Sequence, residues 1–458
     1  MTLLGLAGAY FTLLIGGAGV ALLVLRASSR LNVIEGACLA WLFGVGVVSL
    51  LLLLGGTFSS GIVLQSLVAL FCLALGILGW RTTQKSEVHF SFPRPNSRIE
   101  WILTAALLLE LLTLFIVCLK HTLGWDGLFN WELKARYAFF NSGVLPGSYY
   151  SSPGRGFSHP NYPLAIPFTE LWLYLWMGEP HQFWIKTMFP LFYIAGAFLI
   201  ALFITRLTGK RWLGLLIALL LPFVPFITAG PGGVIVGYVD IPLGVYYVTA
   251  LGYLLCTLEC DLPSSVAAYA ASLTLIPWIK TEGLVLWSLL AGMGLVVGFR
   301  QYRLRAFLIA AFPGLILIIG WSAYLKVMHL VPPSDFARPT FALLANNLDR
   351  VATIGRIAVA ALRDTDLWSI FWLLALVAIV YLIAARSFAR LLLTIAVLGP
   401  VIVYPLTYVF SAWPSYTAHM TSSLPRLFLQ VMPAAWLAIG LALSSPKAES
   451  QTLEPKLG

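Results

Sequence analysis

The chain has 458 residues, of which 60% are hydrophobic and only 10% are charged. A soluble globular domain carries about 25% charged residues, so this composition excludes a water-soluble fold. The formal net charge of +10 does not indicate a nucleic-acid partner, because most Lys and Arg residues lie in short links between apolar runs, where the positive-inside rule places them.

The apolar residues are grouped in runs of roughly 17 to 25 residues, the length that a helix needs to cross the hydrocarbon of a bilayer. A transmembrane barrel would show shorter segments of alternating hydrophobicity instead. We therefore predict an all-α polytopic membrane protein with about thirteen transmembrane helices. The predicted spans are 3–25, 33–55, 61–80, 101–119, 184–204, 212–229, 243–258, 263–279, 283–299, 306–328, 368–385, 390–410 and 424–443.

Basic residues in alternate links set the predicted orientation, because such links stay in the cytoplasm. The N-terminus is then outside, and the polar tail 444–458 is cytoplasmic. Two long segments, 120–183 and 329–366, fall on the outer side. We expect a plasma-membrane protein with its active site on the extracytoplasmic face. The basic links contain Arg26, Arg30, Arg81, Lys85, Arg94, Arg98, Arg206, Lys210, Arg211, Arg300, Arg303, Arg305, Arg386 and Arg390.

A basic linker at 81–100 separates the first three predicted spans from the rest. We interpret residues 1–100 as an accessory unit of three helices with this cytoplasmic linker. Residues 101–443 then form a core of ten predicted spans. The core includes both long outer segments.

The first outer segment carries the strongest candidate for catalysis. Asp126 stands between Trp125 and Gly127, soon after a span ends. An acid beside an aromatic ring at the membrane edge suits proton abstraction. A helix cap or a solvated loop acid explains the same residue equally well.

Other residues of this segment have simpler interpretations beside the functional one. Glu132 and Lys134 fit an ion pair or a surface helix pattern. Tyr162 could stack on a sugar or anchor the loop at the membrane interface. The apolar stretch 164–177 is too short to cross a bilayer and predicts an interfacial helix.

Three further motifs place ionisable residues at the same predicted level. GYVDIPLG puts Asp240 at the outer end of a span, and WIKTEGL puts Lys280 and Glu282 at an outer turn. SSLPRLFLQ lets Arg426 enter the last span from outside. Ionisable groups near membrane depth are costly and indicate function. A guanidinium can bind phosphate through paired hydrogen bonds, although a snorkelling Arg is common.

These residues come from distant parts of the chain but converge on one predicted face. The sequence has no HExxH or comparable ligand spacing that would predict a metal site. It leaves open whether a divalent cation takes part. The sequence also lacks a P-loop and a dinucleotide glycine fingerprint. The converging residues are Asp126, His159, Asp240, Lys280, Glu282, His419 and Arg426.

The order of these motifs resembles the GT-C superfamily of membrane glycosyltransferases. The shared features are an acid in the first outer loop, HPNYPLAIP before an interfacial helix, GYVDIPL, KTEG and a late Arg. The bacterial branch akin to protein mannosyltransferases and aminoarabinose transferases is the most similar. The resemblance covers residues 101–443, whereas this loop has a lone acid where relatives often carry an acidic pair or a basic residue.

The resemblance implies transfer of a sugar from a polyprenyl-phosphate donor to a lipid, glycan or protein acceptor, with inversion. Asp126 would take the acceptor proton, and Arg426 would hold the lipid phosphate. His159 and Lys280 are further phosphate candidates. The residues expected to orient sugar or acceptor are Asp240, Glu282, Glu132, Tyr162 and His419.

A transporter or flippase of lipid-linked saccharides is the alternative from another functional class. It would also have many spans and polar residues within the membrane region. Such a protein typically has inverted repeats and helices broken at mid-membrane. Here the polar residues fall at the outer ends of spans, which favours surface chemistry.

Overall fold

The computed structural model is built almost entirely from helices, with one small two-stranded sheet in the part of the chain that it describes. In this sheet β1 (Arg30–Asn32) pairs in parallel with β2 (His89–Ser91). The pairing fixes the basic linker beside the start of the second helix. The described residues are 2–28, 30–85, 89–260, 262–331 and 335–444.

Within these described residues, ten helical segments are long and apolar enough to cross a membrane, so the prediction of a multi-pass helical membrane protein is confirmed. Three shorter apolar helices occupy further predicted spans: α10 (Arg211–Leu220), α13 (Ser265–Ile279) and α19 (Phe371–Ala384). The long helices are α1 (Thr2–Leu25), α2 (Val33–Gly55), α3 (Gly61–Lys85), α4 (Arg98–Lys120), α9 (Met188–Thr208), α12 (Asp240–Glu259), α14 (Gly283–Arg300), α15 (Leu304–Val327), α20 (Phe388–Thr407) and α21 (Tyr416–Ala442).

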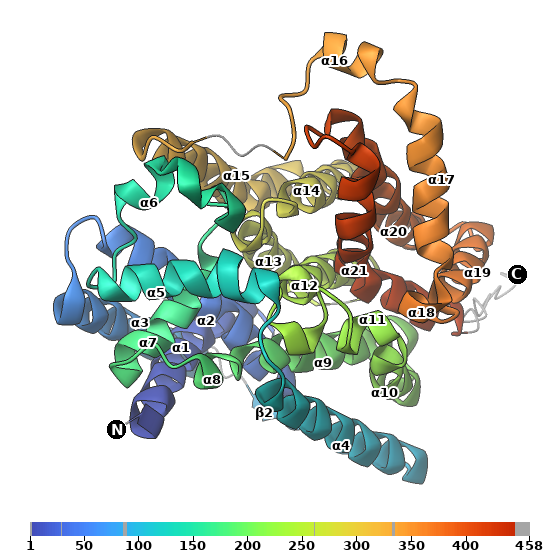
Figure 1. Cartoon of the computed structure of the whole chain (residues 1–458). Coiled ribbons are helices and arrows are strands. Elements are labelled where there is room, and N and C mark those ends of the chain that lie inside the picture. Colours follow the sequence, from blue (N-terminus) through green and yellow to red (C-terminus); the bar gives the residue numbers. More distant parts are fainter. Residues whose placement is uncertain (1, 29, 86–88, 261, 332–334, 445–458) are drawn as a thin grey trace, which may run out of the picture.

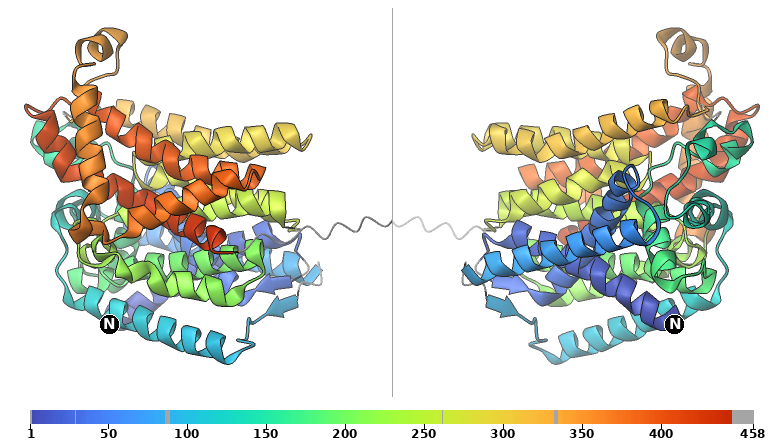
Figure 2. Two further views of the ribbon diagram at one scale, coloured as in Figure 1. Left: turned by 90° about the vertical axis from the view of Figure 1, so that its right-hand side faces the viewer. Right: turned by 90° about the vertical axis from the view of Figure 1, so that its left-hand side faces the viewer.

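Helices α12 and α21 form the centre of the bundle and contact each other (Figure 1). In each of them 89% of the most apolar window is buried within the protein, compared with 17% in α3 and α15. The side views in Figure 2 show α4 along one edge of the bundle and α15 along the opposite edge. Most side chains of α12 and α21 are therefore enclosed by other helices.

Small residues allow the N-terminal helices to pack closely, as is common between membrane helices. A side chain at Gly17 in α1 would collide with the backbone carbonyl of Ala40 in α2. Both helices also contact α7 (Ala165–Met177), and the indole of Trp172 donates a hydrogen bond to the carbonyl of Ala9 at 3.0 Å. The first two helices thus share a core with the first outer segment.

The first outer segment folds into short helices that cover one end of the bundle. The predicted helix at 164–177 is present as α7, but α1, α2 and α5 enclose it, so it does not lie exposed along the membrane surface. Its aromatic and aliphatic side chains are almost all buried. The short helices of the outer segments and neighbouring loops are α5 (Leu133–Phe140), α6 (Gly147–Ser151), α8 (Gln182–Ile185), α11 (Pro225–Thr228), α16 (Phe341–Asn346), α17 (Arg350–Arg363) and α18 (Thr365–Trp368).

The last helix begins eight residues earlier than predicted, at Tyr416 instead of residue 424. The side chain of Ser415 accepts a hydrogen bond from the amide of Ala418 and caps the helix. Hydropathy missed this start because the first two turns are polar. Arg426 consequently lies ten residues inside the helix, which is about 15 Å from its start.

We predict that opposite ends of the bundle are accessible from opposite sides of the membrane. Gly156 is exposed in the first outer segment and a side chain there meets no atom, whereas Tyr302 is 98% exposed in the link between α14 and α15. A Gly156→Cys protein should react with an impermeant maleimide in intact cells. A Tyr302→Cys protein should react only after the membrane is opened.

The unmodified protein supplies the control, since four of its five cysteines are buried and Cys260 is partly exposed. Labelling of both introduced cysteines from the same side would contradict the predicted orientation.

Candidate functional site

A buried carboxylate at the first residue of α12 organises the candidate site. Asp240 is completely buried, and a buried charge is tolerated only when it is paired and hydrogen-bonded. Its Oδ1 accepts hydrogen bonds from Lys280 Nζ at 2.8 Å and from Gln430 Nε2 at 2.7 Å. Its Oδ2 lies 3.2 Å from Arg426 Nε. Both carboxylate oxygens are therefore satisfied by donors from two other parts of the chain.

Lys280, which lies in the link between α13 and α14, pairs with two carboxylates. Its Nζ lies 2.8 Å from Asp240 Oδ1 and 3.0 Å from Glu282 Oε1. Burial acts to lower the pKa of Lys280, but the two carboxylates outweigh burial and raise this pKa above its ordinary value. Lys280 is consequently a charged group with its position fixed on both sides.

Arg426 connects this buried pair to Asp126 of the first outer segment. The guanidinium Nη2 donates to Asp126 Oδ2 in a close contact, and its carbon lies 4.6 Å from the centre of the Tyr238 ring. The side chains of Arg426 and Asp126 retain 17% and 13% of their exposure, unlike buried Asp240. We call Asp126, Asp240, Lys280, Glu282 and Arg426 the Asp240 cluster.

Two loops bring Asp126 to this cluster. The amide of Gly124 donates to the carbonyl of Val236 at 2.8 Å, so the first outer segment docks on the loop that precedes α12. A side chain on Gly127 would lie only 2.7 Å from the same carbonyl. Gly232, at φ +101°, passes so close that a Cβ would lie 3.2 Å from both Arg426 Cγ and Asp240 Oδ2. Glycine is needed here for conformation as well as space.

Asp126 immediately precedes a π-helical segment, Gly127–Glu132. Such segments are rare and occur frequently at functional sites. The segment places Trp131 in a ring stack with Tyr162, with centroids 5.5 Å apart. Tyr162 in turn donates to Glu282 Oε1 at 3.4 Å. The first outer segment is thus connected to the cluster at both Asp126 and Tyr162.

Of the two candidate histidines, His159 reaches the site through Tyr162, whereas no ion pair or hydrogen bond between described residues joins the buried His419 to the Asp240 cluster. His159 stacks on Tyr162 at 4.8 Å, and its Nδ1 lies 3.2 Å from Asp335 Oδ2. His419 Nδ1 is hydrogen-bonded to Ser411 Oγ at 2.9 Å. The hydrogen bond from His159 and that from Trp413 help to lower the pKa of Asp335 to about 2. The second outer segment is therefore held to the first through a charged carboxylate.

Glu132 lies in a separate buried group, and within the described part of the chain no ion pair or hydrogen bond joins it to the Asp240 cluster. It accepts hydrogen bonds from Tyr174 at 2.9 Å and Gln182 at 2.6 Å. This burial contradicts the predicted surface pattern for Glu132 and Lys134. Lys134 instead donates to the carbonyls of Asn130 and Ser158. Buried packing of the first outer segment, which spacing on one helix does not reveal, explains the difference.

Burial shifts the pKa of two further groups beside Glu132. Desolvation lowers the pKa of Lys134 to about 7, although the carboxylates of Asp126 and Glu170 act in the opposite direction. Glu170 is buried with no hydrogen-bond partner for either carboxylate oxygen. Desolvation and the Glu132 carboxylate raise the pKa of Glu170 well above its ordinary value. Burial thus disfavours the charged form of Glu170.

Sequence reasoning missed several partners in the site. Gln430 lies four residues after Arg426, a spacing that places both on one helix face, so helical periodicity could have identified it. Gln430 also accepts a hydrogen bond from Tyr404 at 2.9 Å. Asp335 and Tyr238 gave no comparable signal, because they belong to loops whose path depends on tertiary packing.

The carboxylates of the site are arranged to pair with Lys and Arg side chains and not to bind a metal ion. Arg426 and Lys280 already occupy oxygens of Asp126, Asp240 and Glu282. Among the residues that the structure describes, no group of three or more His, Cys, Asp or Glu residues is arranged to hold a metal ion. The divalent cation left open by the sequence therefore does not fit this arrangement.

Comparisons with protein-family models, curated proteins and solved structures find no match to this chain. The residues of the Asp240 cluster therefore carry the functional proposal by themselves.

We predict that the Asp240 charge is required for stability. Asp240→Asn should lower the free energy of unfolding in detergent by about 2 kcal/mol, because Lys280 and Arg426 lose a buried charged hydrogen-bond partner while Glu282 and Asp126 still compensate their charges. Glu282→Gln is the matched control, since Glu282 pairs with the same Lys280 but retains 22% exposure. Equal and small losses in both variants would contradict a central role for Asp240.

We also predict a pH-dependent contribution from Lys134. The folded pKa is about 7 against an ordinary value of 10.5, so between these values the unfolded chain binds more protons and stability rises with pH. Relative to Lys134→Met, the unmodified protein should gain thermal stability as the pH is raised from 7 towards 10. Lys120→Met, at an exposed position, should show no such trend. A constant difference between Lys134→Met and the unmodified protein would refute the expected titration.

Proposed function

We propose that this protein is a membrane glycosyltransferase that moves a sugar from a polyprenyl-phosphate donor to an acceptor on the extracytoplasmic face. The observation that carries the proposal is the pairing of Asp126 with Arg426 beside the buried Asp240. The pairing puts a proton acceptor and a phosphate ligand in one site. The expected architecture is GT-C-like, with thirteen membrane-crossing segments counting α10, α13 and α19.

The charges of the cluster support a role for Asp126 as base. Three carboxylates face two cations in the Asp240 cluster. One carboxylate can therefore accept a proton without leaving a cation unpaired. Asp126 is suited to this because it is partly exposed at the rim, whereas Asp240 is held by Lys280 and Gln430. We assign proton abstraction to Asp126 and positioning of Arg426 to Asp240.

Donor binding would then activate the base. Arg426 is a fixed cation, and a phosphate ester offers it the paired acceptors that guanidinium binds best. In our proposal the donor phosphate takes the place of Asp126 on the guanidinium. The Asp126 carboxylate is thereby released to accept a proton from the acceptor hydroxyl. Base activity is coupled to the presence of donor.

The transfer step balances with these two groups. The acceptor oxygen forms a bond to the anomeric carbon while the bond from that carbon to the phosphate oxygen breaks. Asp126 receives the hydroxyl proton, and the departing polyprenyl phosphate keeps the bonding electrons. Arg426 stabilises the charge that develops on this phosphate, and fixed donors of this kind supply a large part of many rate enhancements. Attack from the face opposite the phosphate inverts the anomeric centre.

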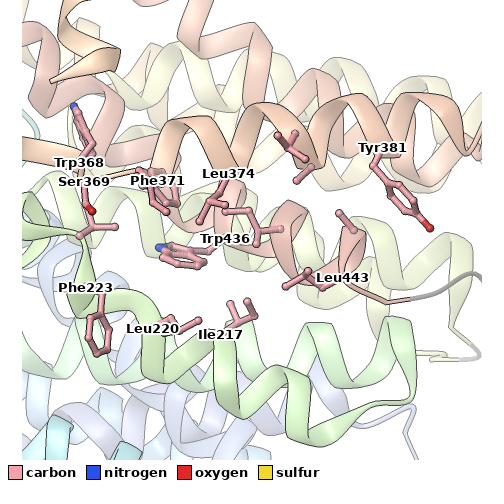
Figure 3. A pocket seen from close by; sticks show the side chains of 16 residues that line it. Ile217, Leu220, Phe223, Trp368, Ser369, Phe371, Leu374, Tyr381, Trp436 and Leu443 are labelled. Carbon is pink, nitrogen blue, oxygen red and sulfur yellow. The ribbon is translucent and has the colours of Figure 1, made fainter. Parts of the chain in front are cut away.

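An apolar cavity of about 520 Å³ supports a lipid-linked donor (Figure 3). Its lining includes Leu220 of α10, Phe371 of α19 and Trp436 of α21. Trp436 lies ten residues beyond Arg426 on the same helix, about 15 Å further along its axis. A polyprenyl chain whose phosphate is bound at Arg426 is long enough to reach this cavity.

We predict that Asp126→Asn abolishes sugar transfer without weakening donor binding. Loss of general-base catalysis should reduce turnover by about 100-fold or more, while Arg426, freed from its partner, remains available to the donor phosphate. Purified protein in lipid should be offered a panel of polyprenyl-phosphate sugars and a membrane extract as acceptor. Release of free polyprenyl phosphate and donor affinity are measured in parallel.

Glu110→Gln is the matched control, because Glu110 is a hydrogen-bonded carboxyl of α4 that accepts from Tyr193 at 2.7 Å outside the cluster. Its release rate should equal that of the unmodified protein. Near-normal release by Asp126→Asn would remove this residue from the base role. Binding of donors without release by any folded protein would favour a transporter or flippase.

A further inference from the structure

A second cavity, of about 750 Å³, lies beside the basic linker, at the end of the bundle opposite to the Asp240 cluster. Residues of α4, α9 and the start of α2 form its walls, and the linker before α4 closes one side. The volume is within the roughly 300 to 1,000 Å³ that is typical of sites for small ligands. Its lining includes Phe92, Arg94, Trp101, Leu108, Phe198, Leu202 and Arg211.

Helix α4 packs mainly against α10 and less against α9, and the cavity lies beside the first half of α4. Cys118, near the end of α4, contacts the carbonyls of Lys186 and Val234 at 3.7 and 3.5 Å. At the start of the helix, Trp101 is 60% exposed although it lines the cavity. The gap therefore borders helix surface that faces the hydrocarbon of the membrane. An occupant with an apolar chain can enter from the bilayer.

The mouth of this cavity carries positive charge. Arg211 donates to the backbone carbonyls of Arg94 and Pro93 at 2.5 and 2.8 Å, which fixes the linker over the cavity and uses two of the five guanidinium donors. The side chain of Arg94 is exposed and forms no ion pair or hydrogen bond with the residues that the structure describes. A cation is thus available at the level expected for lipid head groups.

The one carboxylate that lines the cavity does not oppose an anion. Glu35 accepts two hydrogen bonds from Arg206, each 2.6 Å long, and a third of 2.6 Å from Tyr253. Its charge is therefore compensated within the protein. Thr104 contributes a buried hydroxyl without a hydrogen-bond partner. The cavity combines apolar walls, an unused polar group and a cationic mouth.

We propose that this cavity binds an anionic phospholipid of the cytoplasmic leaflet. The phosphate pairs with Arg94 at the mouth, and an acyl chain lies between α4 and α9. Basic pockets between membrane helices on the cytoplasmic side bind anionic head groups in this manner. The site is independent of the Asp240 cluster, so the proposal does not rest on the proposed transferase activity.

The test is native mass spectrometry of the detergent-purified protein with added phosphatidylglycerol or phosphatidylcholine of identical chains. We expect preferential retention of phosphatidylglycerol and roughly fivefold weaker binding by Arg94→Gln, the effect of one basic residue near an anionic head group. Arg98→Gln is the matched control, because Arg98 is also exposed in this region but does not line the cavity. The Arg98→Gln protein should bind phosphatidylglycerol as tightly as the unmodified protein does.

Thr104→Phe tests the cavity apart from its charge, because a bulky side chain would occupy the space of the acyl chain. This variant should lose phosphatidylglycerol while its melting temperature stays close to that of the unmodified protein. Equal retention of the two lipids would overturn the proposal. Equal losses in Arg94→Gln and Arg98→Gln would also overturn it, since they would indicate diffuse attraction to the surface. Should Thr104→Phe not fold, the two arginine variants decide the outcome.

Discussion

The need to compensate one buried negative charge determines how the centre of this protein is assembled. Asp240 lies at the start of the most enclosed part of the bundle, where an unpaired carboxylate would be strongly destabilising. Its partners Lys280, Gln430 and Arg426 come from a helix link and from the last helix. Because Arg426 also holds Asp126, the same requirement fixes the position of the proposed base. Stability and proposed chemistry therefore share one set of charges.

In the proposed function, helix α21 connects the two environments that a lipid-linked donor would require. Arg426 is a polar anchor within its third turn, and Trp436 faces an apolar cavity further along the same axis. The helix runs from Tyr416 to Ala442 without a break, although Pro425 and Pro433 lie inside it, so it holds both groups on one element. Recognition of a phosphate and accommodation of hydrocarbon can thus be combined without a moving part.

Hydropathy alone predicted the helical, multi-pass class and the approximate positions of the spans, because hydrocarbon imposes a length and a polarity on every crossing helix. Ionisable residues in motifs at the predicted outer ends of spans indicated Asp126, Asp240, Lys280, Glu282 and Arg426 as candidates, and the structure joins these residues. Sequence reasoning failed where tertiary packing decides the outcome. The polar start of α21 at Tyr416, the enclosure of α7 and the burial of Lys134 are not visible in local patterns. Asp335 was missed because no helix periodicity extends into its loop.

The enclosure of α7 by the first two helices has a consequence for biosynthesis. Domains of a growing chain generally fold from the N-terminal end as they are made, and α1 and α2 precede α7 by more than one hundred residues. These helices are available in the bilayer before the first outer segment emerges. They offer Ala9 and neighbouring apolar side chains as a ready surface for Trp172. The first outer segment, which carries Asp126, can therefore pack against the N-terminal helices first. The later helices then bring the charged partners of Asp126.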